Sequence, residues 1–345
     1  MTPEQPASSS EAVPRRRLVT AISSNLSWSE AMRALLCMLP MLVAVAIGEM
    51  TYVVALGQGG FFFSSLLLPK RLSGRLVMGS ILIALGLGFY LMGGTVAPLP
   101  VVAVVFTFFA ALNLSFLTSW RIGGPIALSI VMIYTAGLNT GSPEKAADNF
   151  LAFALVMGWA TLVSMLPVWQ PMMPPAPARP PTNAELAEQG FRMGIGTSLA
   201  LAISYIFEFA KIGWAVSAVG SVVRFDQDMS KKRAMARLLG TLGGALIAGF
   251  LLVRLESVTT LVLIGALFAV LNGLYKRAKV GQMPLFYTAT ILILYSLNDI
   301  KSGKDLAMTR LAYNLVGIAV AVFVVYYPFP MLFGRLRKGR EASQE

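Results

Sequence analysis

The sequence predicts an all-α polytopic membrane protein built from two tandem parallel repeats of about six transmembrane helices each. Hydrophobic residues make up 56% of the 345 residues and charged residues 13%, against about 45–50% and about 25% in soluble domains. Apolar segments of near bilayer length follow one another with short turns. Landmark residues also recur at a nearly constant spacing of about 160 positions.

The amino-terminal residues 1–28 are expected to form a disordered basic cytoplasmic tail. They are rich in Ser, Pro and Glu, contain the run Arg15 to Arg17, and show no sustained apolar period, as is typical of disordered segments. A polar run, SSNLSWSE, stands where a signal peptide would have its apolar core, so no cleavage is expected. Ser27 and Glu30 have capping-box spacing, which places the start of the first helix here.

Two membrane repeats follow, over residues 29–168 and 191–329. Apolar segments of the first have approximate limits 31–48, 52–68, 75–93, 97–117, 121–138 and 148–168. Those of the second are 191–209, 211–225, 235–253, 257–274, 280–298 and 306–327. A proline-rich cytoplasmic linker is expected over 169–190, because prolines cannot continue a helix, and a basic cytoplasmic tail over 330–345. Whether 52–68 and 211–225 cross fully or are broken stays open.

Lysines and arginines are distributed unevenly between the loops. With both termini in the cytoplasm, twenty-two of them fall on the inside and six on the outside, which satisfies the positive-inside rule. The outer six are Lys145, Lys211, Arg254, Lys301, Lys304 and Arg310. Since the basic residues stand in short clusters at span ends, the net charge of +12 indicates contact with the lipid bilayer and not with nucleic acid.

Several kinds of chemistry are excluded by the composition. The chain has no histidine and one cysteine, Cys37, in the first apolar segment. Disulfides, thiolate metal sites and histidine-based catalysis are therefore excluded, and we expect no catalytic residue, metal or cofactor. Gly240-Thr241 is not accompanied by a GKS or GKT sequence, so a phosphate-binding loop is absent. An enzyme is not expected.

Six landmarks recur with a shift of 159 to 161 positions. They are Arg33 and Arg192, Glu49 and Glu208, Gly79-Ser80 and Gly240-Thr241, Tyr134 and Tyr295, Leu151-Ala152 and Leu311-Ala312, and Pro167 and Pro328. An even number of spans per half gives both halves the same orientation, with a pseudo-twofold axis along the membrane normal. Substrate sites in such folds lie near the middle, between the halves.

A basic cluster runs directly into a glycine-rich apolar helix over residues 231–250, KKRAMARLLGTLGGALIAGF. Gly240, Gly244 and Ala248 recur every four residues and are expected to clear one helix face for close packing. Two longer runs carry a resemblance to a known family: GWAVSAVGSVVRFDQDMSKKRAMARLLGTLGGALIAG, from residue 213, and LAMTRLAYNLVGIAVAV, from residue 306.

These runs resemble the fusaric acid resistance and aromatic acid exporter (FUSC-like) family. Typical members place a large cytoplasmic domain after each membrane half, whereas this chain is similar to compact relatives. The resemblance implies a multi-pass protein of the bacterial inner membrane that exports small aromatic or other organic acids, with a periplasmic membrane-fusion adaptor and possible homo-oligomers. A passive organic-anion channel and a non-transporting membrane subunit of an envelope complex are the alternatives.

Basic residues of the second half are candidates for binding the substrate. Arg233, Arg237 and Thr241 stand four residues apart on one helix face, and a planar guanidinium matches a carboxylate bidentately. Anchoring at the lipid interface is the alternative. Arg310 could draw an anion outward or form a structural ion pair with Asp299 or Asp305.

Uncharged polar residues are also present in or at the ends of the apolar segments: Gln58, Asn113, Tyr134, Tyr287, Tyr295, Asn298 and Asn314. Tyr134 and Tyr295 are repeat-related and could stack on an aromatic substrate, or could serve only in hydrogen bonding between helices. Acidic residues are candidates for proton coupling, which would require a raised carboxyl pKa. They are Asp226 and Asp228, which could instead neutralise nearby basic residues, and the repeat-related Glu49 and Glu208, which could be merely solvated helix ends.

Overall fold

The computed structural model describes residues 26–120, 123–171, 181–224, 226–277, 284–297 and 303–326. Over these residues the chain is helical, with loops and no strand. The first half contains α2 (Trp28–Ala46), α3 (Val53–Ser64), α4 (Leu72–Ile81), η1 (Leu82–Gly86), α5 (Leu87–Val96), α6 (Pro100–Leu117), α7 (Gly123–Leu138) and α8 (Pro143–Met165). The second contains α9 (Asn183–Ile206), α10 (Gly213–Val222), α11 (Gln227–Arg254), α12 (Val258–Leu274), α13 (Leu285–Ser296) and α14 (Gly303–Tyr326).

The π-helical turn η1 joins α4 and α5 into one continuous helix, so the described residues form twelve helices. Six of them are long and apolar enough to cross a membrane: Trp28–Ala46, Leu72–Val96, Pro100–Leu117, Pro143–Met165, Gln227–Arg254 and Asp305–Tyr326. Their surfaces expose large apolar side chains such as Val101, Leu155 and Phe250, which suit contact with lipid tails. The chain is a multi-pass membrane protein.

Three of the shortest helices occupy the centre of the molecule. At 1.5 Å per residue, the 12, 10 and 12 residues of α3, α10 and α13 reach about 15–18 Å, roughly half of the hydrocarbon core. Segments 52–68 and 211–225 therefore contain short helices that do not cross fully. Nine of the ten residues in α10 are buried, because α7, α9, α11 and α14 pack around it.

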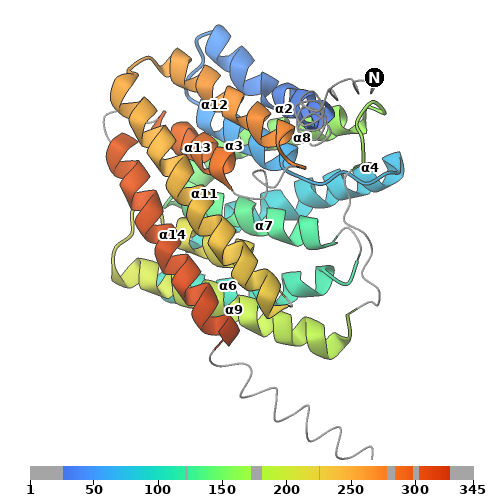
Figure 1. Cartoon of the computed structure of the whole chain (residues 1–345), viewed down its shortest axis with the longest axis vertical. Coiled ribbons are helices and arrows are strands. Elements are labelled where there is room, and N and C mark those ends of the chain that lie inside the picture. Colours follow the sequence, from blue (N-terminus) through green and yellow to red (C-terminus); the bar gives the residue numbers. More distant parts are fainter. Residues whose placement is uncertain are drawn as a thin grey trace, which may run out of the picture.

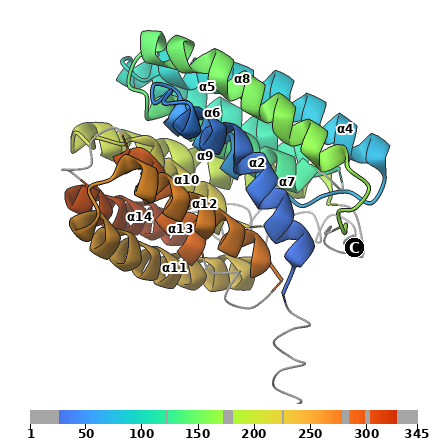
Figure 2. The ribbon, with the colours of Figure 1, turned by 90° about the horizontal axis from the view of Figure 1, so that it is seen from above.

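The two halves lie side by side (Figure 1, Figure 2), and the first helix of each half packs against a helix of the other half. Helix α12 of the second half lies along α2, the first helix of the first half, and α6 of the first half lies along α9, the first helix of the second. Between these pairs, α3 contacts α13 and α7 contacts α10. The central helices of both halves thus meet in the interior.

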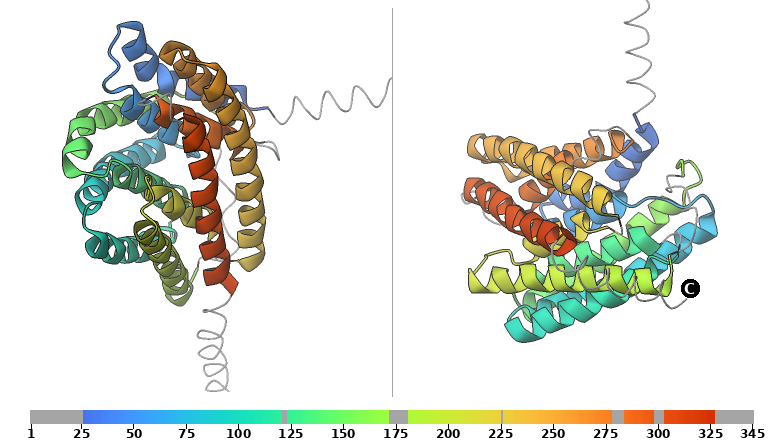
Figure 3. Two further views of the ribbon diagram at one scale, coloured as in Figure 1. Left: turned by 90° about the vertical axis from the view of Figure 1, so that its left-hand side faces the viewer. Right: turned by 60° about the horizontal axis from the view of Figure 1, so that its bottom comes forward.

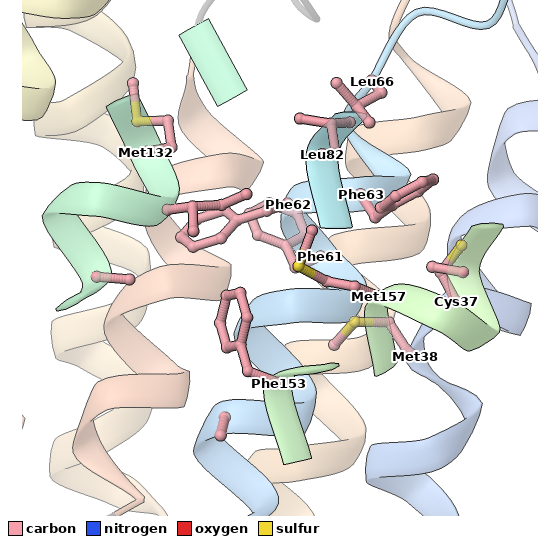
Figure 4. Close-up of a cluster of buried hydrophobic side chains, with 14 of the residues drawn as sticks. Cys37, Met38, Phe61, Phe62, Phe63, Leu66, Leu82, Met132, Phe153 and Met157 are labelled. Carbon is pink, nitrogen blue, oxygen red and sulfur yellow. The ribbon is translucent and has the colours of Figure 1, made fainter. Parts of the chain in front are cut away.

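The largest apolar core is built around α3 (Figure 4). Phe61 and Phe63 of α3 and Phe153 of α8 are almost fully buried. Glycines of α3 allow the neighbouring helices to come close, since a Cβ added at Gly60 would overlap the carbonyl oxygen of Cys37 on α2. The cysteine itself has no exposed surface, as expected for a thiol without a chemical role.

Helix capping differs from the sequence expectation at both halves. The first helix begins beside Ser27, but the Ser27 side chain makes no capping hydrogen bond, so the predicted capping box is wrong. A capping box is present instead at α9, between Thr182 and Glu185. Because this box starts the helix at Asn183, α9 begins inside the stretch expected to be a linker.

The small residues of α11 lie against the start of α13. A Cβ added at Gly240 would overlap Pro284, one added at Gly244 would overlap the carbonyl oxygen of Leu285, and Ala248 is fully buried. Helices α11 and α14 also run side by side (Figure 1; Figure 3, left). The small residues therefore set the distance between α11 and α13.

We expect Gly244→Val to destabilise the protein by about 1–3 kcal/mol, because the added side chain must displace backbone and not a flexible side-chain end. The measurement is the midpoint of thermal unfolding in detergent. Gly249→Val on the same helix is the control, since a Cβ there meets only the Ala307 Cβ at 3.4 Å. Equal midpoints for the two variants would contradict the role given to Gly244.

Candidate anion-binding site

Two arginines of the second half are buried in the interior without an acidic partner among the described residues. Arg237 on α11 is 5% exposed and Arg310 on α14 is 2% exposed. The ion pairs found within the described ranges involve Arg33, Arg192 and Lys276 instead. Uncompensated charge at this depth is expensive and marks a functional position by default.

Arg237 is held by one hydrogen bond and one aromatic ring. Its Nε donates to Oδ1 of Asn314 at 3.2 Å, and its guanidinium carbon lies 5.8 Å from the centre of the Tyr287 ring. The Asn314 amide is itself fixed, because its nitrogen donates to the carbonyl oxygen of Arg310 at 2.8 Å. Nη2 of Arg237 is buried and has no hydrogen-bond partner.

Arg310 is held by an aromatic ring alone. Its guanidinium carbon lies 4.6 Å from the centre of the Trp214 ring, on α10, a cation–π distance. No hydrogen bond joins the guanidinium to another described residue, and its Nε is buried without a partner. The predicted pair with Asp305 is not formed, since Asp305 is exposed, and Asp299 lies outside the described residues.

Tyr295 connects this site to the first half. Its ring lies 5.5 Å from that of Trp214, edge to face. The Tyr295 hydroxyl accepts a hydrogen bond from the Asn139 amide at 3.1 Å, and the Gln58 side chain lies near this hydroxyl. Asn139 follows α7 and Gln58 belongs to α3, so both halves contribute to the surroundings of the arginines.

A lysine lies beside Tyr295 at the end of α7. The Lys211 Nζ is 5.3 Å from the Tyr295 ring centre and donates to the carbonyl oxygen of Asn139 at 3.4 Å. Burial lowers the pKa of the Lys211 ammonium, and the positive charge of Lys145 lowers it further. Basic side chains therefore continue from the site toward the loop before α10.

Hydrogen-bonding groups around the arginines are left unused. The Trp214 Nε1 and the hydroxyls of Thr241 and Thr288 are buried without a partner. Thr241 lies one turn beyond Arg237 on α11, and Thr288 faces Gly244 from α13. Two cations surrounded by unused donors form a site that can hold an anion.

Two other buried arginines, Arg33 and Arg75, make several hydrogen bonds each. Arg33 donates to Glu30 at 2.6 Å and to the carbonyl oxygens of Ser64 and Leu66 at the end of α3, at 2.7 and 2.8 Å. The guanidinium of Arg75 donates to four carbonyl oxygens, those of Pro69, Ser164, Leu166 and Trp169. Comparison with these structural arginines shows how unusual the bonding of Arg310 is.

Lys276 completes the cluster around Glu30. Its Nζ donates to the Glu30 carboxylate at 2.9 Å and to the Leu66 carbonyl at 2.7 Å. Burial lowers the pKa of Lys276 to about 8, and the charge of Glu30 opposes part of that shift. Since Lys276 follows α12 and Glu30 lies on α2, this cluster ties the two halves together.

The remaining basic and acidic candidates lie away from the arginine site. Arg233 is exposed although Arg237 is buried, and Asp228 is exposed in the first turn of α11. Asp226 caps that helix by accepting from the backbone of Asp228 and Met229.

Glu49 and Glu208 are exposed after α2 and α9. A hydrogen bond from Thr51 lowers the pKa of the Glu49 carboxyl, the opposite of what a proton carrier needs. Glu208 has a positive φ of 51°. If Glu49 or Glu208 carries protons, it does so at a distance from the arginine site.

Tyr134 lies in a separate aromatic cluster. Its hydroxyl shares a hydrogen bond of 2.7 Å with Thr107, and its ring packs against Phe89 and Phe106. A small cavity of about 10 Å³ adjoins it, lined by both halves, including Thr197 and Val216 of the second. This apolar cavity contains none of the basic candidates.

Sequence reasoning missed Trp214, Asn139 and Thr288, and gave Lys211 no role beyond orientation. A tryptophan placed directly after Gly213, at the start of a short apolar segment, was the available signal for Trp214. Asn139 and Lys211 stand at the ends of predicted spans, where polar residues are ordinary. Their meeting at Tyr295 depends on contacts between the halves, which no local pattern encodes.

Comparison with known proteins places the arginine pair within a family match. Residues 199–324 match the family described as fusaric acid resistance protein-like. A Synechocystis sp. protein, the uncharacterized protein slr1298, is 24% identical over 185 residues, which are 54% of this chain and 24% of the relative. The chain thus spans about a quarter of that relative's length, and no solved structure matches. Both runs on which the predicted resemblance rests lie within residues 199–324, so this match confirms that the second half of the chain resembles the fusaric acid resistance protein-like family.

Proposed function

We propose that this protein is a secondary transporter that exports small organic acids across the bacterial inner membrane, with Arg237 and Arg310 binding the carboxylate. The observation that supports the proposal best is the bonding of Arg310: a guanidinium 2% exposed, stacked on Trp214, with no hydrogen bond to another described residue. A buried cation left in this state is costly. An anion in transit would neutralise it and use its donors.

The surroundings of the arginines favour an organic anion. The rings of Trp214, Tyr287 and Tyr295 surround the two guanidiniums, and aromatic faces can support the flat or apolar body of an acid. Small inorganic anions make no use of such faces. An aromatic acid is therefore the substrate that we favour.

We also propose that the two halves are like-oriented repeats with both termini in the cytoplasm. The reciprocal packing of α6 on α9 and of α12 on α2 supports a pseudo-twofold arrangement. With the landmark shifts of 160 and 161, Arg237, Arg310 and Asn314 correspond to Leu76, Phe150 and Ala154. The proposed site is thus specific to the second half. A periplasmic adaptor and homo-oligomers are further proposals from the family.

A passive organic-anion channel is the second candidate function. The observation that favours it is the position of the acids: among the described residues Glu30 is the one buried carboxylate, and it is ion-paired with Arg33 and Lys276. Proton coupling would then depend on exposed carboxylates such as Asp226. Collapse of the proton gradient distinguishes the two, since it stops coupled export and leaves channel flux unchanged.

The test of the proposal compares two arginines four residues apart. In proteoliposomes loaded with a radiolabelled aromatic acid, Arg237→Gln is expected to lower efflux about 10- to 100-fold, because charge-assisted hydrogen bonds contribute about 1.5–3 kcal/mol. Arg233→Gln is the matched control and should change efflux less than about twofold, since Arg233 is exposed. Normal efflux in both variants would contradict the role given to Arg237, whereas absence of efflux from the unmodified protein would support a non-transporting membrane subunit.

A further inference from the structure

We infer that the arginine site selects organic dianions, in particular dicarboxylates, over monocarboxylates. The inference rests on the proposed function and specifies its substrate class. Its starting point is the number of charges. Arg237 and Arg310 supply two positive charges, and neither is paired with an acid in the part of the chain that the structure describes.

The helices that form the site offer no counter-charge. Among the described residues, α3, α7, α10 and α13 contain no acidic side chain. Helices α11 and α14 contain Asp228 and Asp305, each in the first turn and exposed. A monocarboxylate bound here would leave one buried positive charge uncompensated, which costs several kcal/mol in an apolar interior. A dicarboxylate neutralises both.

The unused polar atoms at the site are chiefly donors. Arg237 Nη2, Arg310 Nε and Trp214 Nε1 are buried without partners, and none of them can accept a hydrogen bond. The hydroxyls of Thr241 and Thr288 can donate as well. The complementary ligand therefore presents acceptor oxygens to several separate donors, as two carboxylates do.

The two guanidiniums lie on different aromatic rings. Arg237 lies over Tyr287 of α13 and Arg310 over Trp214 of α10. Asn314 links the Arg237 side chain to the backbone of Arg310, since its oxygen accepts from Arg237 and its nitrogen donates to the Arg310 carbonyl. This arrangement provides two cations with an aromatic surface beside each, which suits an acid with two carboxylates on an apolar body.

The experiment compares acids of one shape and different charge. Terephthalate carries two carboxylates, and 4-carbamoylbenzoate replaces one of them with an amide of nearly the same size. Binding of each to the purified full-length protein in lipid nanodiscs is measured by isothermal titration calorimetry at pH 7.5, with isophthalate and its monoamide as a second geometry. We expect each dianion to bind at least about tenfold more tightly than its monoamide.

The Arg310→Gln variant tests whether the preference for a dianion depends on the presence of both cations. With one cation left, the preference for the dianion should fall to about twofold or less, because binding of the dianion weakens more than binding of the monoamide. Equal binding of dianion and monoamide to the unmodified protein would overturn the inference. If that shared binding were still lost in Arg237→Gln, the proposed transport function would stand without the dianion preference.

Sulfate is the probe that separates charge from shape. The inference expects sulfate to bind at least about tenfold more weakly than terephthalate, because sulfate has no apolar body to contact the rings. Sulfate binding as tight as that of terephthalate would overturn the requirement for an organic ligand. Absence of binding for all of the acids and for sulfate would overturn both the inference and the assignment of the site.

Discussion

Replacing Arg310 with glutamine is expected to raise the thermal stability of the ligand-free protein while lowering organic-acid transport about 10- to 100-fold. The gain in stability follows from removal of a buried charge that has no acidic partner and no hydrogen bond among the described residues. Loss of the cation–π contact with Trp214 offsets part of it. We expect a net gain of about 1–2 kcal/mol.

The measurements are the midpoint of thermal unfolding without added acid and the rate of efflux from proteoliposomes. Arg75→Gln is the matched control, because Arg75 is also buried but donates to four carbonyl oxygens. That variant should lose stability, since it leaves those carbonyls without their donors. A loss of stability in Arg310→Gln with unchanged efflux would identify Arg310 as structural and remove it from the site.

The second large effect is expected from Glu30→Gln, which should destabilise the protein by about 3–5 kcal/mol. Glu30 is buried between Arg33 and Lys276 and accepts from both. Without its charge, two buried cations face each other at the contact between α2 and α12. Because this contact joins the halves, unfolding of the variant should begin with separation of these two helices.

Thermal unfolding in detergent measures the effect, and hydrogen exchange of α2 and α12 locates it. Glu256→Gln is the control, since Glu256 is exposed and should change stability little. Lys276→Met removes one cation and leaves the Arg33–Glu30 pair intact, so it should cost less than Glu30→Gln. A smaller loss for Glu30→Gln than for Lys276→Met would contradict this account of the cluster.

The general architecture follows from local patterns in the sequence. Long apolar runs interrupted by polar turns predict a helical membrane protein, and the sequence already raised the question of whether 52–68 and 211–225 cross the membrane fully. A charged residue within an apolar run is costly unless it has a function, and Arg237 and Arg310 were predicted as candidates for that reason. These features depend on neighbours along the chain, and the sequence displays them directly.

The burial of individual side chains and the contacts between residues far apart in the sequence are harder to predict from the sequence. Arg233 and Arg237 share one helix face, but the structure exposes the first and buries the second, and Arg237 is hydrogen-bonded to Asn314 of α14. Tyr134 and Tyr295 were paired by their spacing in the sequence, but of these two residues Tyr295 is the one that packs against Trp214 beside the arginines. The partner of Glu30 is Lys276, 246 positions away.

The most direct test of the central claim is an experimental structure of the protein with a bound brominated dicarboxylate. The account predicts ligand density between α10, α11 and α14, with one carboxylate near Arg310 Nε and the other near Arg237 Nη2. Density at another place, or a structure in which both guanidiniums form ion pairs with carboxylates of the chain itself, would contradict it.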